Sequence, residues 1–296
     1  MPTRILLHGG AGVRPGRDYA EVLVHLREVV EACASALADG RSALETVQQA
    51  VRALEDSGLY LAGRGGSPNA AGVVELDAAI MDGGGEDALP RAGSVAALVG
   101  FRSPVDAARA VMEATPHVLL AGEGAARFAD AQGLARVPDE PGWYRLPAGV
   151  VPADMAGGAA ALAHGTVGAV ALDDAGRLAA ATSTAGLFGK LPGRVGDSPI
   201  VGGGTWADGE VAISCTGVGE AFLLGGGAYD VAARMAYGGA RLDEATAAFL
   251  ARVAALGGNG GLIALARDGR FAMPFTGSGM KRAVAGEGIA TEVAIG

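Results

Sequence analysis

Glycine constrains the fold of this chain more than any other residue type. It occupies 50 of the 296 positions, while aromatic residues make up only 5% and hydrophobic residues 50% of the chain. Small side chains let sheets and helices approach one another closely and pack at high density. The composition therefore favours layered sheets and helices around a large core, in one large domain or two modest ones.

Charge and cysteine content exclude several classes of protein. The formal net charge is −9 and no basic block stands out, which argues against nucleic acid or an anionic membrane as a partner. Cys33 and Cys215 lack metal-ligand spacing, so we expect buried thiols in a reducing cytoplasm rather than a disulfide. No apolar signal core precedes a cleavage site at the N-terminus. Residues 155–172 contain no charged side chain, but their glycines, His164 and Thr166 indicate a turn entering a strand rather than a membrane span.

Short apolar segments bounded by glycine or aspartate predict the strands. They cover residues 4–8, 75–82, 94–99, 167–173, 178–182, 211–214 and 262–266. Hairpin-like connections, such as the turn at 174–176, outnumber clear helical crossovers. We therefore expect an α+β fold with mainly antiparallel sheets between helix layers.

Capping signals predict where the helices begin. Asp18 with Glu21 and Ser42 with Glu45 match the capping-box pattern, and Pro104 is pre-shaped for a first helical position. The second helix should run to about residue 55, and further helices should lie around 219–237 and 243–256. Residues 133–156 are rich in proline, glycine and charge, so we expect a mobile linker there.

Thr166 is the residue most informative about chemistry. A threonine hydroxyl is a poor nucleophile without a base, and no Ser-His-Asp arrangement presents itself among only four histidines. An N-terminal threonine uses its own amine, whose pKa of ~8 leaves a useful fraction unprotonated at neutral pH. That amine exists only if the Gly165–Thr166 bond is broken, and glycine leaves room for the hydroxyl to attack the preceding carbonyl. Taken alone, Gly-Thr-Val-Gly can equally be a loop entering a strand.

Longer segments along nearly the whole chain resemble one family, the plant-type L-asparaginases or isoaspartyl peptidases of the N-terminal nucleophile hydrolase superfamily. The segments include LHGGAG at 7–12, ELDAAIMDG at 75–83, GTVGAVALD at 165–173, KLPGRVGDSP at 190–199 and SCTGVGE at 214–220. The resemblance implies a single domain over 1–296 with a four-layer αββα sandwich. It also implies a precursor that cuts itself into residues 1–165, ending in the mobile linker from about 133, and residues 166–296.

The resemblance also implies the catalytic roles. Thr166 would attack the side-chain amide carbonyl of a small β-aspartyl substrate, and Thr184 would support the nucleophile and its developing charge. Thr216 and the backbone N–H of Gly217 would form the oxyanion hole. Losing one such donor typically costs about 10²–10³ in rate.

The other end of the substrate would be held by Arg194, Asp197 and Gly219. A guanidinium matches the α-carboxylate with paired hydrogen bonds, and a carboxylate matches the α-ammonium. Gly219 would leave space and present its carbonyl. Composition alone also allows Arg194 and Asp197 to be a solvated ion pair on a Pro-Gly loop. His8 and Gly10 would belong to a loop that sets the geometry for self-cleavage.

No cofactor is expected for catalysis, because no His/Cys/Asp/Glu cluster has ligand spacing. The family does hold a structural sodium ion on backbone carbonyls. Here the resemblance would place it on the carbonyls of Leu54, Glu55, Ser57, Tyr60, Ala62 and Arg64. The expected assembly is a dimer of cleaved αβ heterodimers.

The chain departs from the family pattern in a few places. Leu61 stands where an asparagine beside the nucleophile is usual, and Ala185-Gly186 replaces paired glycines. The linker is also shorter than in many relatives. Two alternative functions stay open at this point: a relative that cleaves the glycan–asparagine linkage, and an uncleaved scaffold without catalysis. The preferred substrate, asparagine or an isoaspartyl dipeptide, and the cleavage state of the chain are also open.

Overall fold

The computed structural model describes residues 1–85, 88–138, 142–151, 154 and 165–296. Its first half contains β1 (Arg4–His8), α1 (Ala20–Ala38), α2 (Ala43–Ser57), the short 3-10 helix η1 (Gly63–Gly65), β2 (Leu76–Asp82), β3 (Arg91–Leu98), α3 (Pro104–Ala114), β4 (Leu119–Ala121) and α4 (Gly122–Ala131). Its second half contains β5 (Thr166–Leu172), β6 (Leu178–Thr184), β7 (Thr205–Ala207), β8 (Val211–Gly217), α6 (Gly219–Gly225), α7 (Gly227–Gly238), α8 (Leu242–Ala255), β9 (Gly260–Ala266), β10 (Phe271–Ala272), β11 (Arg282–Gly286) and β12 (Ile289–Ala294).

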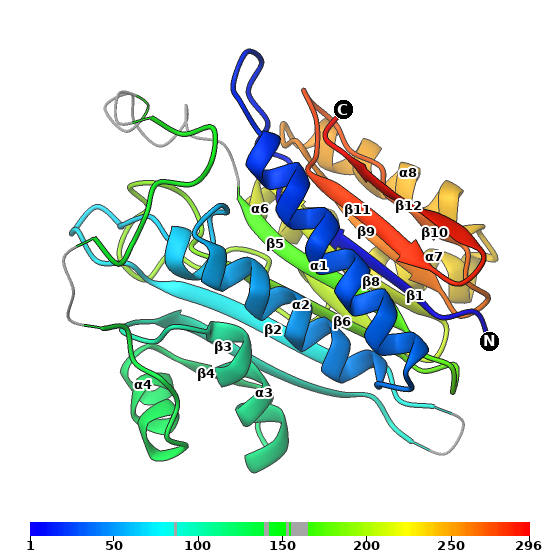
Figure 1. Cartoon of the computed structure of the whole chain (residues 1–296), viewed down its shortest axis with the longest axis horizontal. Coiled ribbons are helices and arrows are strands. Elements are labelled where there is room, and N and C mark those ends of the chain that lie inside the picture. Colours follow the sequence, from blue (N-terminus) through cyan, green and yellow to red (C-terminus); the bar gives the residue numbers. More distant parts are fainter. Residues whose placement is uncertain (86–87, 139–141, 152–153, 155–164) are drawn as a thin grey trace.

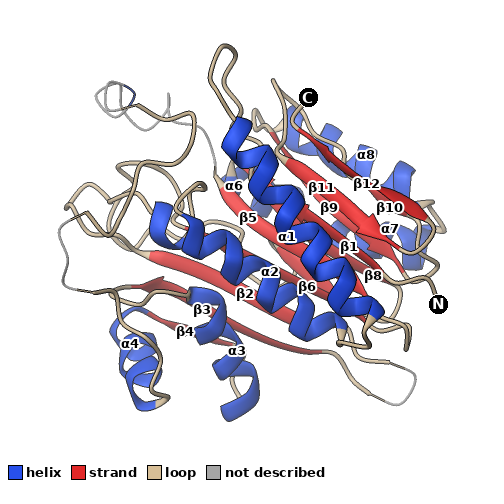
Figure 2. Cartoon of the chain, viewed as in Figure 1, coloured by secondary structure: helices blue, strands red, loops and turns tan. Residues whose placement is uncertain are grey.

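The strands form two sheets, as Figure 2 shows. The larger has the order β12-β11-β1-β5-β6-β2-β3-β4, and the smaller has the order β10-β9-β8-β7. Neighbouring strands are antiparallel at every pairing except β3 with β4, which is parallel. The predicted α+β class with mainly antiparallel sheets is confirmed.

Alternation along the strands explains how both faces of the larger sheet are buried. In β5, Val167 belongs to a core cluster shared with α1 to α4. Val170, three residues further along the same strand, belongs to a second cluster shared with β8 and β9. A third cluster joins the outer face of the smaller sheet to α6, α7 and α8. Figure 1 shows α1 and α2 crossing one side of the larger sheet, with α7 and α8 on the far side. Successive side chains of a strand point to opposite faces, so a strand buried on both faces needs apolar residues throughout.

Strand register places the predicted nucleophile in the middle of the larger sheet. β5 lies between β1 and β6, and its first residue Thr166 faces Thr184, the last residue of β6. On the other side, His8 at the end of β1 faces Gly168. Three segments that the sequence singled out therefore meet at one end of three adjacent strands.

Some helix predictions are confirmed and others are wrong in detail. Ser42 and Glu45 form the predicted capping box at the start of α2. Asp18 is not the N-cap of α1, because the helix begins at Ala20 and the N-cap position belongs to Tyr19. Tyr19 is buried, its hydroxyl accepts a hydrogen bond from the Arg14 amide, and its side chain makes no capping hydrogen bond to the helix.

The segment 219–237 is two helices rather than one. Gly226, between α6 and α7, has φ +101, a left-handed conformation that ends the first helix and is favourable only for glycine.

Backbone hydrogen bonds hold the start of the expected linker. The Arg102 amide donates to the Ala135 carbonyl, and the Val137 amide donates to the Gly100 carbonyl.

The predicted burial of both cysteines is confirmed, since Cys33 and Cys215 are buried free thiols. Of residues 155–172, those from 155 to 164 lie outside the described residues, and 166–172 form β5. None of the helices within the described ranges combines the length and apolar character needed to span a membrane.

Candidate active site

Thr166 and Thr184 bring their hydroxyls together at the start of β5. Both residues are buried, and Thr166 Oγ1 lies 3.4 Å from Thr184 Oγ1. Thr184 Oγ1 in turn donates to the carbonyl oxygen of Gly165 at 2.8 Å and accepts from the Gly186 amide at 2.9 Å. One hydroxyl therefore contacts both the predicted nucleophile and the carbonyl that precedes it.

Two glycines let neighbouring segments pack closely against the Gly165–Thr166 peptide bond. Gly10 has φ +97, and a Cβ at this position would lie 3.3 Å from both Gly165 Cα and Thr166 N. On the other side, a Cβ on Gly165 would overlap the Cβ of Leu61. The predicted loop of His8 and Gly10 thus lies directly against this bond, and Leu61 lies against its other side.

His8 holds the backbone of Thr166 from within the larger sheet. Its Nδ1 lies 3.1 Å from the Thr166 carbonyl oxygen, and its Nε2 lies 2.9 Å from Ser214 Oγ. Complete burial lowers the pKa of His8 to about 3, so the ring is neutral at physiological pH. Because a carbonyl only accepts, the single ring proton belongs on Nδ1.

Thr216 and Gly217 end β8 close to the loop of Gly10. Thr216 is completely buried, and its Oγ1 accepts from the Ala11 amide at 3.3 Å. A Cβ on Gly217 would lie 2.5 Å from the carbonyl oxygen of Asn259, so this position needs glycine. The predicted oxyanion-hole residues are thereby joined to the same loop that contacts the Gly165–Thr166 bond.

The three residues predicted to bind substrate, Arg194, Asp197 and Gly219, lie close together. A Cβ on Gly219 would lie 2.8 Å from Asp197 Oδ1 and 3.1 Å from Arg194 Nη2. The Arg194 guanidinium makes two 2.8 Å hydrogen bonds to Glu220, with its side chain 16% exposed against 54% for Glu220. Arg194 therefore has an ion-pair partner, but that partner is the exposed Glu220 rather than Asp197.

Asp197 has the electrostatics of a cation receptor. Its side chain is buried, and within the described part of the chain its Oδ2 has no hydrogen-bond partner. Burial raises the pKa of this carboxyl to about 7, although the nearby Arg194 charge opposes the shift. A buried carboxylate without a full set of partners gains more from a bound ammonium than a solvated one would.

Gly186 connects the two halves of the site. Its amide donates to Thr184 Oγ1, and a Cβ at this position would lie 3.2 Å from Arg194 Nη1. The hydroxyl pair and the Arg194–Asp197–Gly219 group are therefore parts of one continuous site.

Sequence reasoning missed a buried ion pair beneath this site. Lys190 Nζ lies 3.6 Å from Asp77 Oδ2, with both side chains completely buried, and it donates to the Glu75 carbonyl at 3.1 Å. Asp77 faces Thr184 across the β2–β6 pairing. The available signal was a lysine and an aspartate within the segments that carry the family resemblance.

The loop predicted to hold sodium brings several carbonyls close to two glycines. A Cβ on Gly63 would lie 2.6 Å from the Glu55 carbonyl oxygen, and a Cβ on Gly65 would overlap the Tyr60 carbonyl oxygen. Four of the six predicted carbonyls also accept hydrogen bonds, namely those of Leu54, Tyr60, Ala62 and Arg64. A second lone pair on each oxygen is compatible with a cation. Within the described residues no group of three or more His, Cys, Asp or Glu side chains could hold a metal.

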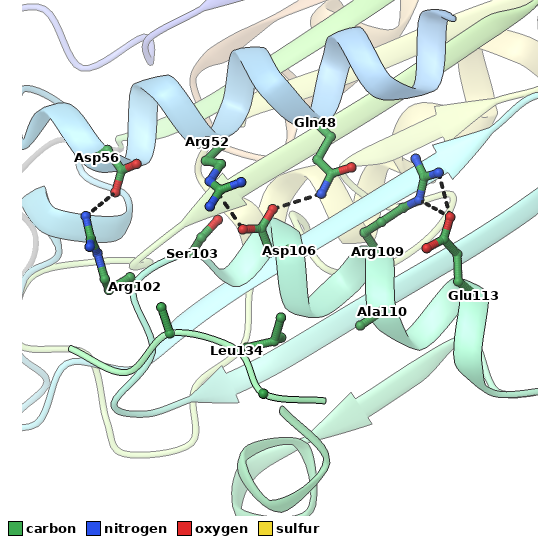
Figure 3. A pocket seen from close by; sticks show the side chains of 12 residues that line it. Gln48, Arg52, Asp56, Arg102, Ser103, Asp106, Arg109, Ala110, Glu113 and Leu134 are labelled. Carbon is green, nitrogen blue, oxygen red and sulfur yellow. Dashed lines mark hydrogen bonds and ion pairs between the residues drawn. The ribbon is translucent and has the colours of Figure 1, made fainter. Parts of the chain in front are cut away.

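A surface hollow between α2 and α3 lies apart from these residues (Figure 3). Its lining contains three charge pairs, Arg52 with Asp106 at 3.3 Å, Arg102 with Asp56 at 3.5 Å and Arg109 with Glu113 at 2.6 Å. None of the predicted site residues lines this hollow. Because each arginine there is paired with a carboxylate, the hollow offers a substrate no unmatched charge of the kind found at Asp197.

Comparison with known proteins identifies the family of the chain. The sequence model of the asparaginase family matches residues 1–144 and 148–295 of this chain. The chain is 46% identical over 299 residues to an isoaspartyl peptidase of Salmonella typhimurium, covering 94% of each protein. It is 46% identical over 297 residues to an isoaspartyl peptidase of Escherichia coli, covering 94% of this chain and 91% of the relative. It is also 41% identical over 232 residues to a plant-type L-asparaginase of Thermococcus kodakarensis, covering 73% and 74%.

The chain therefore belongs to the asparaginase family, together with isoaspartyl peptidases and plant-type L-asparaginases.

Proposed function

We propose that this protein is a self-processing amidohydrolase that cleaves β-aspartyl amide bonds, in isoaspartyl dipeptides and L-asparagine, with Thr166 as the N-terminal nucleophile. One observation carries the proposal: Thr184 Oγ1 lies 3.4 Å from the Thr166 hydroxyl and donates to the Gly165 carbonyl at 2.8 Å. The names of the relatives, isoaspartyl peptidase and L-asparaginase, supply the substrate class.

The first reaction is cleavage of the protein's own chain. Thr166 Oγ1 attacks the carbonyl carbon of Gly165, the Gly165–Thr166 C–N bond breaks, and the hydroxyl proton passes to the nitrogen. The acyl group is then an ester on Oγ1, which water hydrolyses to a carboxylate on Gly165 and a free hydroxyl and amine on Thr166. The proton that Thr184 donates to the Gly165 oxygen stabilises the charge developing there.

The free amine then acts as the base for substrate hydrolysis. It takes the proton of the Thr166 hydroxyl, which attacks the side-chain carbonyl of the substrate. Thr216 Oγ1 and the Gly217 amide stabilise the oxyanion, and the leaving amine or ammonia takes a proton as the C–N bond breaks. Water hydrolyses the resulting ester, which releases aspartate and restores the enzyme.

Arg194, Asp197 and Gly219 hold the α-groups of the substrate. Arg194 binds the α-carboxylate through its paired N–H groups. Part of its hydrogen bonding to the exposed Glu220 is lost when the substrate binds. Asp197 binds the α-ammonium, which supplies the partner that its buried Oδ2 lacks within the described residues. The Gly219 carbonyl adds a further acceptor for the ammonium.

The architecture and assembly are part of the same proposal. Two sheets packed face to face, with helices against both outer faces, support the αββα sandwich of a single domain over 1–296. Cleavage gives subunits 1–165 and 166–296, which pair as a dimer of heterodimers in the cytoplasm. The carbonyls around Gly63 and Gly65 would hold a structural sodium ion that rigidifies the loop next to Leu61 without taking part in the chemistry.

A denaturing gel and a substrate comparison test the proposal together. Two bands, with hydrolysis of β-aspartyl dipeptides and asparagine, are expected. A single band at 29.2 kDa that persists for days would instead indicate an uncleaved scaffold. Faster hydrolysis of a glycosylasparagine than of either β-aspartyl substrate would indicate the glycan-linkage activity.

A further inference from the structure

A row of buried hydroxyls connects the smaller sheet to the backbone of Thr166. Ser214 Oγ on β8 lies 2.9 Å from His8 Nε2 and 2.7 Å from Thr182 Oγ1 on β6. Thr205 Oγ1 on β7 lies 2.7 Å from Thr182 Oγ1. All four side chains are completely buried, and the row ends at the Thr166 carbonyl through His8 Nδ1 at 3.1 Å.

Counting protons gives this row a direction. The Thr166 carbonyl only accepts, so a neutral His8 ring carries its proton on Nδ1 and presents a lone pair at Nε2. Ser214 must then donate its single proton to Nε2, and Thr182 must donate to Ser214. Thr205 Oγ1 lies 2.7 Å from Thr182 Oγ1 and 3.0 Å from the Ser198 carbonyl oxygen, and both can accept its single proton. The protons of Thr182, Ser214 and His8 therefore point toward Thr166.

Gly168 is an independent sign that the row is built into the fold. A Cβ at this position of β5 would overlap both Ser214 Oγ and His8 Nε2. Any other residue at 168 would push the serine and histidine apart. The glycine therefore leaves the space in which the Ser214–His8 hydrogen bond forms beneath the strand.

We propose that Ser214 is a positioning residue: by donating to His8 Nε2 it holds the ring in the orientation in which Nδ1–H donates to the Thr166 carbonyl, and so orients the nucleophile. This inference rests on the proposed function. Ser214 acts through His8 and does not touch the substrate.

The need for such a hold follows from the proposed cleavage. Once the Gly165–Thr166 bond is broken, Thr166 becomes a chain end, and chain ends fray unless they are tied down. The hydrogen bond from His8 holds the Thr166 carbonyl, which is bonded to the Cα that carries the α-amine and the side chain with Oγ1. Displacements of about 1 Å at reacting atoms can cost on the order of 10² in rate.

The tautomer of His8 can be read directly. The chain has four histidines, so ¹⁵N-histidine labelling gives few enough ring signals to assign. Wild-type protein should show His8 protonated on Nδ1 alone. In Ser214→Ala, Nε2 loses its donor while the Thr166 carbonyl still accepts from Nδ1, so we expect the proton to stay on Nδ1 but the Nδ1–H signal to shift and broaden as the ring becomes mobile.

Kinetics provide the second measurement. For Ser214→Ala, we expect kcat to fall about 10- to 100-fold, with KM for asparagine changed less than about twofold, because the Arg194 and Asp197 contacts are untouched. Thr182→Val, which keeps the shape of the side chain but removes the donor to Ser214, should show a smaller change in the same direction. Ser94→Ala is the matched control: Ser94 is also completely buried, and within the described residues its Oγ has no hydrogen-bond partner.

The possible outcomes distinguish a failure of the positioning role of Ser214 from a failure of the proposed function. An unchanged His8 Nδ1–H signal in both Ser214→Ala and Thr182→Val, or a rise in KM at constant kcat, would overturn the positioning role. If Ser214→Ala does not fold, the Nδ1–H signal and kcat of Thr182→Val decide. Absence of cleavage and turnover in the wild type would instead reject the proposed function, while the tautomer measurement would still report on the hydrogen bonds.

Discussion

Leu61 packs directly against Gly165, so closely that a Cβ on residue 165 would overlap the Leu61 Cβ. Leu61 is buried, and its carbonyl accepts from the Ala185 amide at 2.9 Å, which ties it to the residue after Thr184. Leu61 thus places an apolar side chain beside the bond proposed to break. The residue before Thr166 is consequently restricted to glycine.

Substitution of that glycine should block processing. In Gly165→Ala the new methyl group has no space beside Leu61, so the peptide must shift from the Thr166 hydroxyl, and we expect cleavage to slow by on the order of 10². The measurement is the fraction of uncleaved chain against time on a denaturing gel. Leu61→Gly in the same chain removes the overlapping Cβ and should restore part of the rate. Cleavage of Gly165→Ala at the wild-type rate would show that this contact does not restrict the site.

Removal of the Thr184 hydroxyl should slow processing through a different cause. Thr184→Val keeps the shape but removes the donor to the Gly165 oxygen, and we expect a loss of about 10²–10³ in the cleavage rate. Mass spectrometry of the intact protein over time follows the reaction. Thr246→Val is the matched control, because Thr246 is a buried threonine in α8 whose hydroxyl donates to the Asp243 carbonyl. Equal rates for the two variants would remove Thr184 from the reaction.

Arg194 should affect substrate use and leave self-cleavage largely intact. Arg194→Ala removes the paired donors for the α-carboxylate, so kcat/KM for asparagine should fall by about 10² or more, while two bands still form on the gel. Arg102→Ala, in the hollow of Figure 3, removes a paired arginine outside the site and should change neither property. Unchanged kcat/KM in Arg194→Ala would remove it from the site.

Asp197 should make binding of the α-ammonium depend on pH. Burial raises the pKa of its carboxyl to about 7, so the carboxyl is mostly neutral below that pH and charged above it. Because the ammonium binds the charged form, the inhibition constant for the product L-aspartate should fall about tenfold from about pH 6 to about pH 8. Asp197→Asn should bind more weakly and lose this dependence. An inhibition constant that rises over the same interval would contradict the assignment.

Strand pattern and capping signals predicted much of the fold because they act locally. Apolar segments such as 178–182 and 211–214 were found, although β6 continues to Thr184 and β8 to Gly217. The extensions contain Ser183 and Thr184 in β6 and Thr216 and Gly217 in β8, which carry no apolar signal even though they pair in the sheet. The strand β11 was missed because its buried apolar part is only three residues long, and β12 was missed because exposed side chains alternate along it.

The candidate site was predictable only where its residues lie in the segments that resemble the asparaginase family. Thr166, Arg194 and Asp197 came from such segments, and the structure places them in one continuous region. The row from Thr205 to His8 was not foreseen, because its members come from four strands and meet only through sheet pairing and packing. Sequence spacing gives no information about a contact of that kind.

The central claim is that a free amine on Thr166 makes the enzyme active. Cleaved and uncleaved chains can be separated after partial processing, their masses measured to identify the end at Thr166, and each assayed with a β-aspartyl dipeptide. The account predicts that turnover resides in the cleaved fraction alone. Equal turnover by chains whose 165–166 peptide bond is intact would contradict it.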